Sequence, residues 1–117
     1  MTPNELTRRC NNAESFIVAN DGQYLGKLSL NRFDPESILN NYGLYGSQYS
    51  VTSIYNKYSM YGSQYSSLSP FNPFTSTPPH IYLKGVRVGV LSVNRYIMGS
   101  VDPEHIQIWM KINNLYI

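Results

Sequence analysis

Histidine and cysteine are the side chains of this protein best suited to catalysis or metal binding, and they are few. The chain has 2 histidines, His80 and His105, which could bind a metal with Asp21, Asp34 or Asp102. No zinc-type spacing such as HExxH or CxxC accompanies them. We therefore expect ordinary surface or strand-edge histidines, no metal and no cofactor. A small hydrolase or metal-dependent enzyme that uses His80 or His105 stays open as an alternative function.

Nucleophilic catalysis finds equally little support. Cys10 lies in the segment RRCNN, where Arg8 and Arg9 could activate its thiol, but nothing in the sequence places a histidine beside it. The serines of the GSQYS segments lack the strand–elbow–helix context of a GxSxG motif. The acidic residues of the two Asp-Pro-Glu segments are typical of helix starts. We therefore predict no catalytic residue.

Two arginines occupy equivalent positions in a repeated segment. Arg32 follows Asn31, and Arg95 follows Asn94. In a fold with pseudo-two-fold symmetry they could form one clamp for an anion or a carboxylate. Alternatively, each arginine stacks on a tyrosine or donates a hydrogen bond to a loop carbonyl.

The middle of the chain is rich in tyrosine and almost uncharged. Residues 37–79 contain seven of the 11 tyrosines and a single charged residue, Lys57. Tyrosine mixed with serine, asparagine and glycine is typical of adaptable recognition surfaces. We expect four of these tyrosines to be exposed for binding. We expect Tyr42 and Tyr58 to pack in the core. The four candidates are Tyr45, Tyr49, Tyr61 and Tyr65.

This tyrosine-rich stretch is built from a 16-residue repeat. The copies begin at Ser37, Ser53 and Ser69, and the first two share the segment YGSQYS unchanged. Ile38 and Tyr42 are four residues apart and would share one face of a helix. The Gly-Ser steps are typical of turns. We therefore predict one or two helical turns followed by a tight turn in each copy.

A second repeat flanks the first. Residues 21–33, DGQYLGKLSLNRF, match residues 84–96, KGVRVGVLSVNRY, and each copy follows a short apolar run. The Asn-Asp-Gly and Lys-Gly segments are typical of the tight turns that join antiparallel strands. Since a lone hairpin is marginally stable, we expect the two to pair into one sheet.

These patterns predict a single domain of α+β class, mainly β, in which two related β-hairpins form one sheet, bridged by three short tyrosine-rich helix/turn repeats. Alternating apolar residues in the tail favour a final strand, although the preceding Asp-Pro-Glu leaves a helix start open. The expected segments are a possibly flexible N-terminus at 1–14, hairpins at 15–33 and 80–96, repeats at 34–79 and a C-terminal strand at 102–117.

The order of these motifs resembles a group of small bacterial proteins and C-terminal domains. The shared features are YLG, then Asn31 and an aromatic residue before the Asp-Pro of residues 34–35, then paired YGSxYS units. The resemblance covers residues 19–96. No activity is assigned to this group, so the resemblance implies none. Some members are appended to other domains, which implies an accessory or recognition role.

Composition limits the classes of partner. The 117 residues carry 9 Lys+Arg against 7 Asp+Glu, and this net charge of +2 does not indicate a nucleic-acid partner. The single cysteine excludes a disulfide framework, and no apolar run is long enough to cross a bilayer. The lack of a signal sequence favours the cytoplasm, and pairing of a sheet edge leaves a homo-oligomer open.

The function predicted from the sequence is a non-catalytic binding or interaction module. Its tyrosine-rich face would recognise a protein or a polysaccharide, since one lysine in the repeats provides no cationic path for a nucleic acid. A stand-alone inhibitor of a larger protein is a further alternative.

Overall fold

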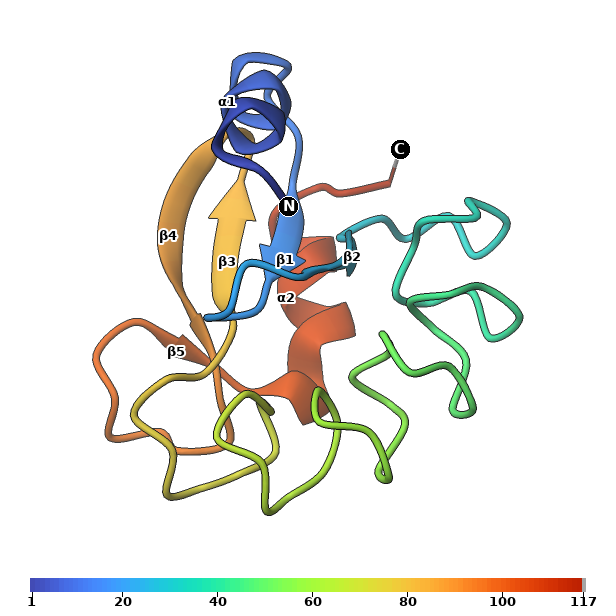
Figure 1. The fold of residues 1–117 in the computed structure, drawn as a ribbon. Coiled ribbons are helices and arrows are strands. Elements are labelled where there is room, and N and C mark those ends of the chain that lie inside the picture. The colour runs from blue at the N-terminus through green and yellow to red at the C-terminus, as the bar shows by residue number, and fades with distance from the viewer. Residues whose placement is uncertain (117) are drawn as a thin grey trace.

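Five strands form one mixed sheet in the order β2-β1-β3-β4-β5 in the computed structural model, which describes residues 1–116 (Figure 1). Two short helices and a 3-10 turn complete the secondary structure, so the domain is α+β and mainly β, as expected. The elements are α1 Pro3–Asn11, β1 Phe16–Val18, β2 Tyr24–Lys27, β3 His80–Leu83, β4 Val86–Leu91, β5 Ser100–Val101, η1 Pro103–His105 and α2 Ile106–Ile112. Neither helix is long and apolar enough to cross a membrane, in the part of the chain that is described.

The first four strands in the sequence, β1 to β4, are related in pairs. β1 pairs antiparallel with β2, β3 pairs antiparallel with β4, and the pairs meet where β1 lies antiparallel to β3. Ile17 lies opposite Gly26 in the first pair and Ile81 lies opposite Gly89 in the second, and the register shifts next to each isoleucine. A bulge at a glycine lets another segment approach the sheet closely. The matching sequence motifs therefore occupy matching places in the sheet.

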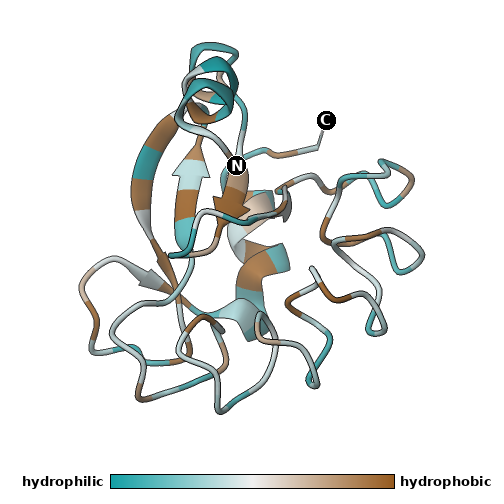
Figure 2. Cartoon of the chain, viewed as in Figure 1, coloured by the Kyte–Doolittle hydropathy of each residue, from teal (hydrophilic) through white to brown (hydrophobic). Residues whose placement is uncertain are grey.

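The sheet has a different hydrophobic cluster on each face. On one face, Ile17, Leu25 and Ile81 pack in a cluster that includes Ile106 and Met110 of η1–α2 and the repeat region. On the other face, Phe16, Val18 and Tyr24 pack against α1. Figure 2 shows the corresponding brown bands on the central strands and on α2. Strand β1 is buried on both sides and holds the layers together.

The repeat region is a succession of β-turns, which we call the turn coil (residues 31–77). A serine, asparagine or aspartate begins a new turn at nearly every third residue: the N–H of Ser37 donates to the carbonyl of Asp34, and that of Asn40 to the carbonyl of Ser37. The step is four residues at Gly43–Ser47, and the sum of these steps gives the 16-residue period. In Figure 1 the turn coil forms a scalloped arc around α2.

The prediction of helical turns within residues 34–79 is wrong, because no helix lies there. The side-chain oxygen that begins each turn accepts a hydrogen bond from the N–H two residues later, as Ser53 Oγ does from Tyr55 and Asn56 Oδ1 from Tyr58. Such bonds offer the backbone an alternative to the helical pattern. A chain with one of these residues at nearly every third position therefore turns repeatedly instead of forming a helix.

The repeated asparagines also join successive turns. The amide nitrogens of Asn40, Asn56 and Asn72 donate to carbonyl oxygens six residues earlier, at 3.0 to 3.2 Å. Each asparagine side chain thus satisfies two backbone groups at once, an N–H ahead of it and a carbonyl behind it. The hydroxyls of Ser37, Ser50 and Ser66 act in the same way, since each accepts the N–H two residues ahead and donates to a carbonyl oxygen earlier in the chain. Asparagine and serine side chains therefore both join one turn to another.

The expected C-terminal strand at 102–117 is also wrong, within the residues described, since η1 and α2 occupy this segment and residue 117 lies outside them. Asp102 Oδ1 caps the turn by accepting from the N–H of Glu104 at 2.9 Å, and Pro103 is the first helical residue. Burial follows helical spacing: Ile106 and Met110 are buried, whereas Ile108 and Ile112 are exposed. Alternate apolar residues therefore do not share a face.

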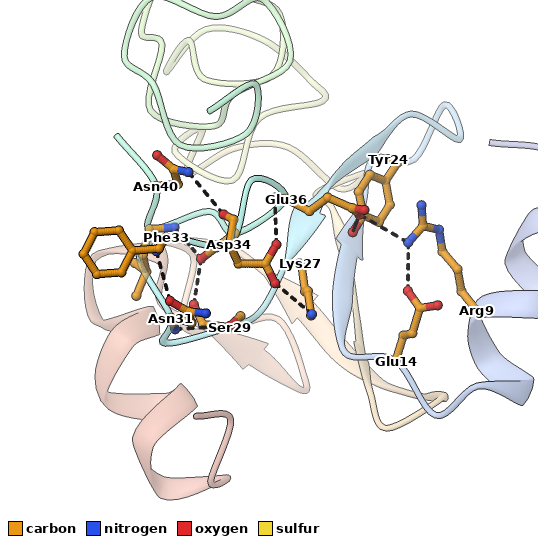
Figure 3. A network of polar contacts seen from close by, with 12 residues as sticks. Arg9, Glu14, Tyr24, Lys27, Ser29, Asn31, Phe33, Asp34, Glu36 and Asn40 are labelled. Atoms are coloured by element: carbon orange, nitrogen blue, oxygen red, sulfur yellow. Dashed lines mark hydrogen bonds and ion pairs between the residues drawn. The ribbon is translucent and has the colours of Figure 1, made fainter. Parts of the chain in front are cut away.

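The N-terminal segment forms helix α1, although the sequence suggested a flexible start for residues 1–14. Thr2 caps this helix through a hydrogen bond from the N–H of Glu5. The N-terminal amine donates to the carbonyl of Gly22 at 2.8 Å. The guanidinium of Arg9 lies 3.9 Å from the centre of the Tyr24 ring. Figure 3 shows Arg9 between Glu14 and the Tyr24–Glu36 pair, which ties α1 to the sheet.

Candidate binding surface

The histidines are bound to local partners and do not form a common site. Nε2 of His80 lies 3.2 Å from Oδ1 of Asn20, and Nε of Arg87 donates to Nδ1 of His80. Partial burial and the Arg87 charge lower the pKa of His80. Nδ1 of His105 lies 3.5 Å from Oδ2 of Asp102, the residue that caps η1. Among residues 1–116, no three His, Cys, Asp or Glu side chains are grouped as a metal site would need. Cys10 packs in the cluster beneath α1.

Two of the tyrosines expected at the surface point inward. Tyr61 is buried, and its hydroxyl donates to Asp21 at 2.8 Å. Tyr45, sixteen residues earlier, is half-buried and packs edge-on against the ring of Tyr24, with centroids 5.1 Å apart. Burial and the hydrogen bond to Asp21 raise the pKa of Tyr61 to about 12. The prediction that Tyr45 and Tyr61 are exposed is therefore wrong.

Two tyrosines expected in the core point outward. Tyr42 is 100% exposed and Tyr58 is 86% exposed, so the prediction that they pack inside is wrong. The prediction relied on helical spacing from Ile38 and Ile54, which lie in the core as expected. Each tyrosine instead occupies the third position of a turn that an asparagine begins, and its side chain points away from the core. Tyr49 and Tyr65 are exposed as expected.

One rule describes all the most exposed aromatic side chains of the turn segments. Each stands two residues after a serine or asparagine whose side-chain oxygen accepts its N–H, at 2.9 to 3.2 Å. The local sequence is N-x-[FY] or S-Q-Y. These residues are Phe33, Tyr42, Tyr49, Tyr58, Tyr65, Phe74 and Tyr96, which are 83 to 100% exposed. The backbone under each ring is therefore held by the same pair of turn hydrogen bonds.

Five of these rings border a continuous series of depressions. Tyr49 and Tyr58 line one of about 470 Å³, and Tyr58 and Tyr65 line the next, of about 710 Å³. Tyr65 and Phe74 line a third of about 340 Å³, and Phe74 and Tyr96 line a fourth of about 670 Å³. We call Tyr49, Tyr58, Tyr65, Phe74 and Tyr96 the aromatic row. Because neighbouring depressions share a ring, the row is one extended surface.

Phe33 and Tyr42 obey the same turn rule but line none of these depressions. Figure 3 shows the ring of Phe33 pointing away from the polar network at the start of the turn coil. In that network the N–H of Phe33 donates to Asn31, and Lys27 pairs with Asp34 at 2.8 Å. Phe33 and Tyr42 are therefore as exposed as the rings of the aromatic row, but they do not border its depressions.

The polar lining of the row consists mainly of amides and hydroxyls, with three charged residues. The side chain of Gln64 lies between two depressions and lines both, and Gln48 lines the depression of Tyr49. Within residues 1–116 neither glutamine side chain makes a hydrogen bond, so both amides are free to donate and accept. The charged groups that line the row are Lys57 in the middle and Arg95 and Asp102 at one end.

The two arginines lie in different depressions. Arg95 lines the last depression of the row, and its guanidinium lies 5.5 Å from the ring centre of Tyr96. Arg32 lines a depression of about 530 Å³ that shares Gln48 and Tyr55 with the depression of Tyr49, and Nη2 of Arg32 lies 3.4 Å from Oε1 of Gln107. The depressions of the two arginines share no lining residue, so the structure does not bring the arginines together as one clamp.

Three exposed rings that are not among the residues predicted to bind, Phe33, Phe74 and Tyr96, have a recognisable sequence motif. Between residues 31 and 96 the motif N-x-[FY] occurs at Asn31, Asn40, Asn56, Asn72 and Asn94, both inside and outside the 16-residue repeats. Aligning the copies drew attention to YGSQYS and left Phe33, Phe74 and Tyr96 out of the candidate list. A search for N-x-[FY] selects Phe33, Phe74 and Tyr96, whereas an aromatic residue two positions after a serine is also found in the core, as Tyr61 shows. Comparison with protein-family models found no match to this chain, and neither did comparison with curated proteins or with solved structures.

Proposed function

We propose that this protein is a non-catalytic binding module that recognises a protein or a polysaccharide through the aromatic row. The observation that carries the proposal is the series of rings, each more than four-fifths exposed, at one repeated turn position along joined depressions. Exposed aromatic side chains are unfavourable in water unless a partner covers them, and clusters of this kind are typical of interaction sites.

Rigid presentation supports a binding role. The N–H of each row residue is bonded to a side chain two residues earlier, and the turns are tied to one another by asparagine amides. Since the backbone is already ordered, binding of a partner does not have to include the entropic cost of ordering it. Tyrosine adds a hydroxyl at the ring edge, which can donate to or accept from the partner.

An enzymatic function has weaker support. His80 and His105 are each held by local partners and lie outside the depressions of the aromatic row. The row is lined mainly by rings, amides and hydroxyls, and its two charged groups suited to proton transfer, Lys57 and Asp102, line different depressions within residues 1–116.

The experiment that tests this proposal is an affinity capture from soluble and envelope fractions of the source cells, with bound protein and carbohydrate both assayed. Tyr58→Ala/Tyr65→Ala removes the centre of the row, and Phe33→Ala/Tyr42→Ala is the matched control with two equally exposed rings outside it. We expect capture that the first variant loses and the second retains. Capture that is the same with both variants would contradict a role for the row. Tyr45 and Tyr61 are kept intact because they are part of the fold.

A further inference from the structure

The aromatic row has the chemistry of a site for an uncharged polymer with repeated units. We infer that it binds a single chain of a neutral polysaccharide, laid along the successive depressions from Tyr49 to Tyr96. The inference rests on the proposed function and names the class of ligand that the surface fits.

Charge excludes ionic polymers as the matching ligand. Along the depressions from Tyr49 to Phe74 the single charged lining residue is Lys57, among residues 1–116. At the Tyr96 end, Arg95 and Asp102 have opposite signs. A polyanion such as a nucleic acid or an acidic glycan needs a row of cations to replace its counterions. The surface offers a polyanion no such row, and Lys57 is the one charged residue that a neutral chain would meet between Tyr49 and Phe74, among residues 1–116.

The rings and free amides match the two kinds of surface on a sugar. A pyranose ring presents C–H groups on its faces, which pack on aromatic rings, and hydroxyl groups around its edge, which both donate and accept. The aromatic row offers a partner for both kinds of sugar surface. Tyr58 and Tyr65 flank one depression, and Gln64, whose side-chain amide makes no hydrogen bond within the described part of the chain, also lines it. Gln48 has the same place beside Tyr49. An amide that can donate and accept suits a hydroxyl in either orientation.

The arrangement of the rings favours an extended chain over a folded protein partner. Protein interfaces gather their aromatic anchors near the centre of a packed patch with a polar rim. Here the rings are separated from one another by depressions and stay 83 to 92% exposed. The SQY unit occurs twice with the same turn bond, from Tyr49 to Ser47 and from Tyr65 to Ser63. A surface that repeats the same contact suits a ligand whose own units repeat, and it gains affinity by multivalency.

Affinity electrophoresis of the purified chain at pH 6, run toward the cathode, tests the inference. The gels contain hydroxyethyl cellulose, laminarin, soluble starch or galactomannan as neutral probes, and polygalacturonate as the anionic probe. We expect at least one neutral polymer to slow the protein. Tyr58→Ala/Tyr65→Ala should weaken that interaction about tenfold, from the loss of two stacking contacts. Phe33→Ala/Tyr42→Ala should leave it unchanged, and Gln64→Ala should weaken it less than the double tyrosine variant.

Competition with oligosaccharides of the active polymer separates chain binding from capture of a chain end. Hexasaccharides should compete and disaccharides should not, because only the longer ligand spans adjacent depressions. Competition by disaccharides at the same concentration would overturn the extended mode of binding.

Three results distinguish the inference from the proposal beneath it. Retardation by no neutral polymer, or preference for polygalacturonate, overturns the polysaccharide assignment. If the capture experiment meanwhile finds a protein that Tyr58→Ala/Tyr65→Ala loses, the binding module stands and the ligand class is wrong. If neither assay depends on the aromatic row, both the inference and the proposed function fail.

Discussion

The carbonyl oxygen of Asn56 lies directly against Gly62, where a Cβ atom would approach it to 2.1 Å. Gly46 has the same relation to Asn40, again at 2.1 Å, sixteen residues earlier in the coil. A side chain tip could rotate away from such a contact, but a backbone carbonyl that accepts a turn hydrogen bond cannot. Glycine is therefore required in each YGSQYS segment, within the four-residue steps Gly43–Ser47 and Ser59–Ser63, because no Cβ atom fits against the carbonyl group.

Substitution of this glycine should destabilise the fold. We expect Gly62→Ala to lower the free energy of unfolding by about 1–3 kcal/mol, the usual cost of forcing an extra methyl group into a packed site. Urea denaturation followed by far-UV circular dichroism measures the change. Ser76→Ala, an exposed substitution at the end of the coil, is the control and should have little effect. Equal stability of the two variants would contradict the close approach.

The two hydrogen bonds of each repeated asparagine can be separated by substitution. Asn56→Ser keeps an oxygen for the N–H of Tyr58 but removes the amide that donates to the carbonyl of Ser50, which keeps its other donor, the N–H of Ser53. Asn56→Ala removes both partners. We expect losses of roughly 1 kcal/mol for serine and roughly 2 kcal/mol for alanine, from the usual effect of each unmade bond in a buried site. Thermal unfolding of the two variants gives the order, and a serine variant less stable than the alanine variant would contradict it.

The buried Tyr61 hydroxyl should make stability depend on alkaline pH. Burial and the bond to Asp21 raise the pKa of Tyr61 from 10.0 to about 12. Since the unfolded chain releases this proton at lower pH than the folded protein, stability from Tyr61 is complete below pH 10 and is lost as the pH rises to 12. Phe at this position cannot ionise. The difference in melting temperature between wild type and Tyr61→Phe should therefore fall from pH 9 to pH 12, and a difference that stays constant would contradict the prediction.

The ion pair between Lys27 and Asp34, at the start of the turn coil, should lose its stabilising effect in acid. Burial alone would raise the pKa of Asp34, but the hydrogen bonds from Lys27 and from the N–H of Glu36 outweigh burial and lower it. A carboxyl with a lowered pKa stabilises the fold above the pKa of the unfolded chain, near 3.8, and this stabilisation disappears as the pH falls. We expect the stability gap between wild type and Lys27→Met to be largest above pH 4 and to close toward pH 2, as measured by urea denaturation at each pH. A gap that widens in acid would contradict the assignment.

The mainly β fold could be predicted because its signals are local. Short apolar runs next to Asp-Gly and Lys-Gly turns mark strands, and the matching glycines of residues 26 and 89 mark corresponding bulges. The tail could not be assigned in the same way. Its alternating isoleucines favour a strand, but η1 begins at the Asp-Pro-Glu segment, and Ile106 and Met110 fit the available core four residues apart. Packing decided between two patterns that coexist in the sequence.

The binding surface was only half predictable. Tyr49 and Tyr65 could be selected from composition, but Tyr42 and Tyr58 were assigned to a helical face that does not exist. The 16-residue period hides a three-residue period, because one longer step in each copy shifts the phase of the turns. The turns are visible once serine and asparagine are treated as turn-forming residues along the whole stretch. Position within a turn still does not decide which ring points outward, since Tyr61 and Tyr65 both stand two residues after a serine that accepts their N–H, and Tyr61 is buried whereas Tyr65 is exposed.

The asymmetry between local and distant contacts bears on how the chain folds. Within the coil, backbone and side-chain bonds join residues two, three or six positions apart, whereas the pairing of β1 with β3 joins Val18 to His80. Local contacts form quickly, and the entropy lost in closing a long loop slows distant ones. We expect the turns to form early and the meeting of the two hairpins to limit the folding rate. The repeats would then shorten the effective loop between two strands that the sequence holds far apart.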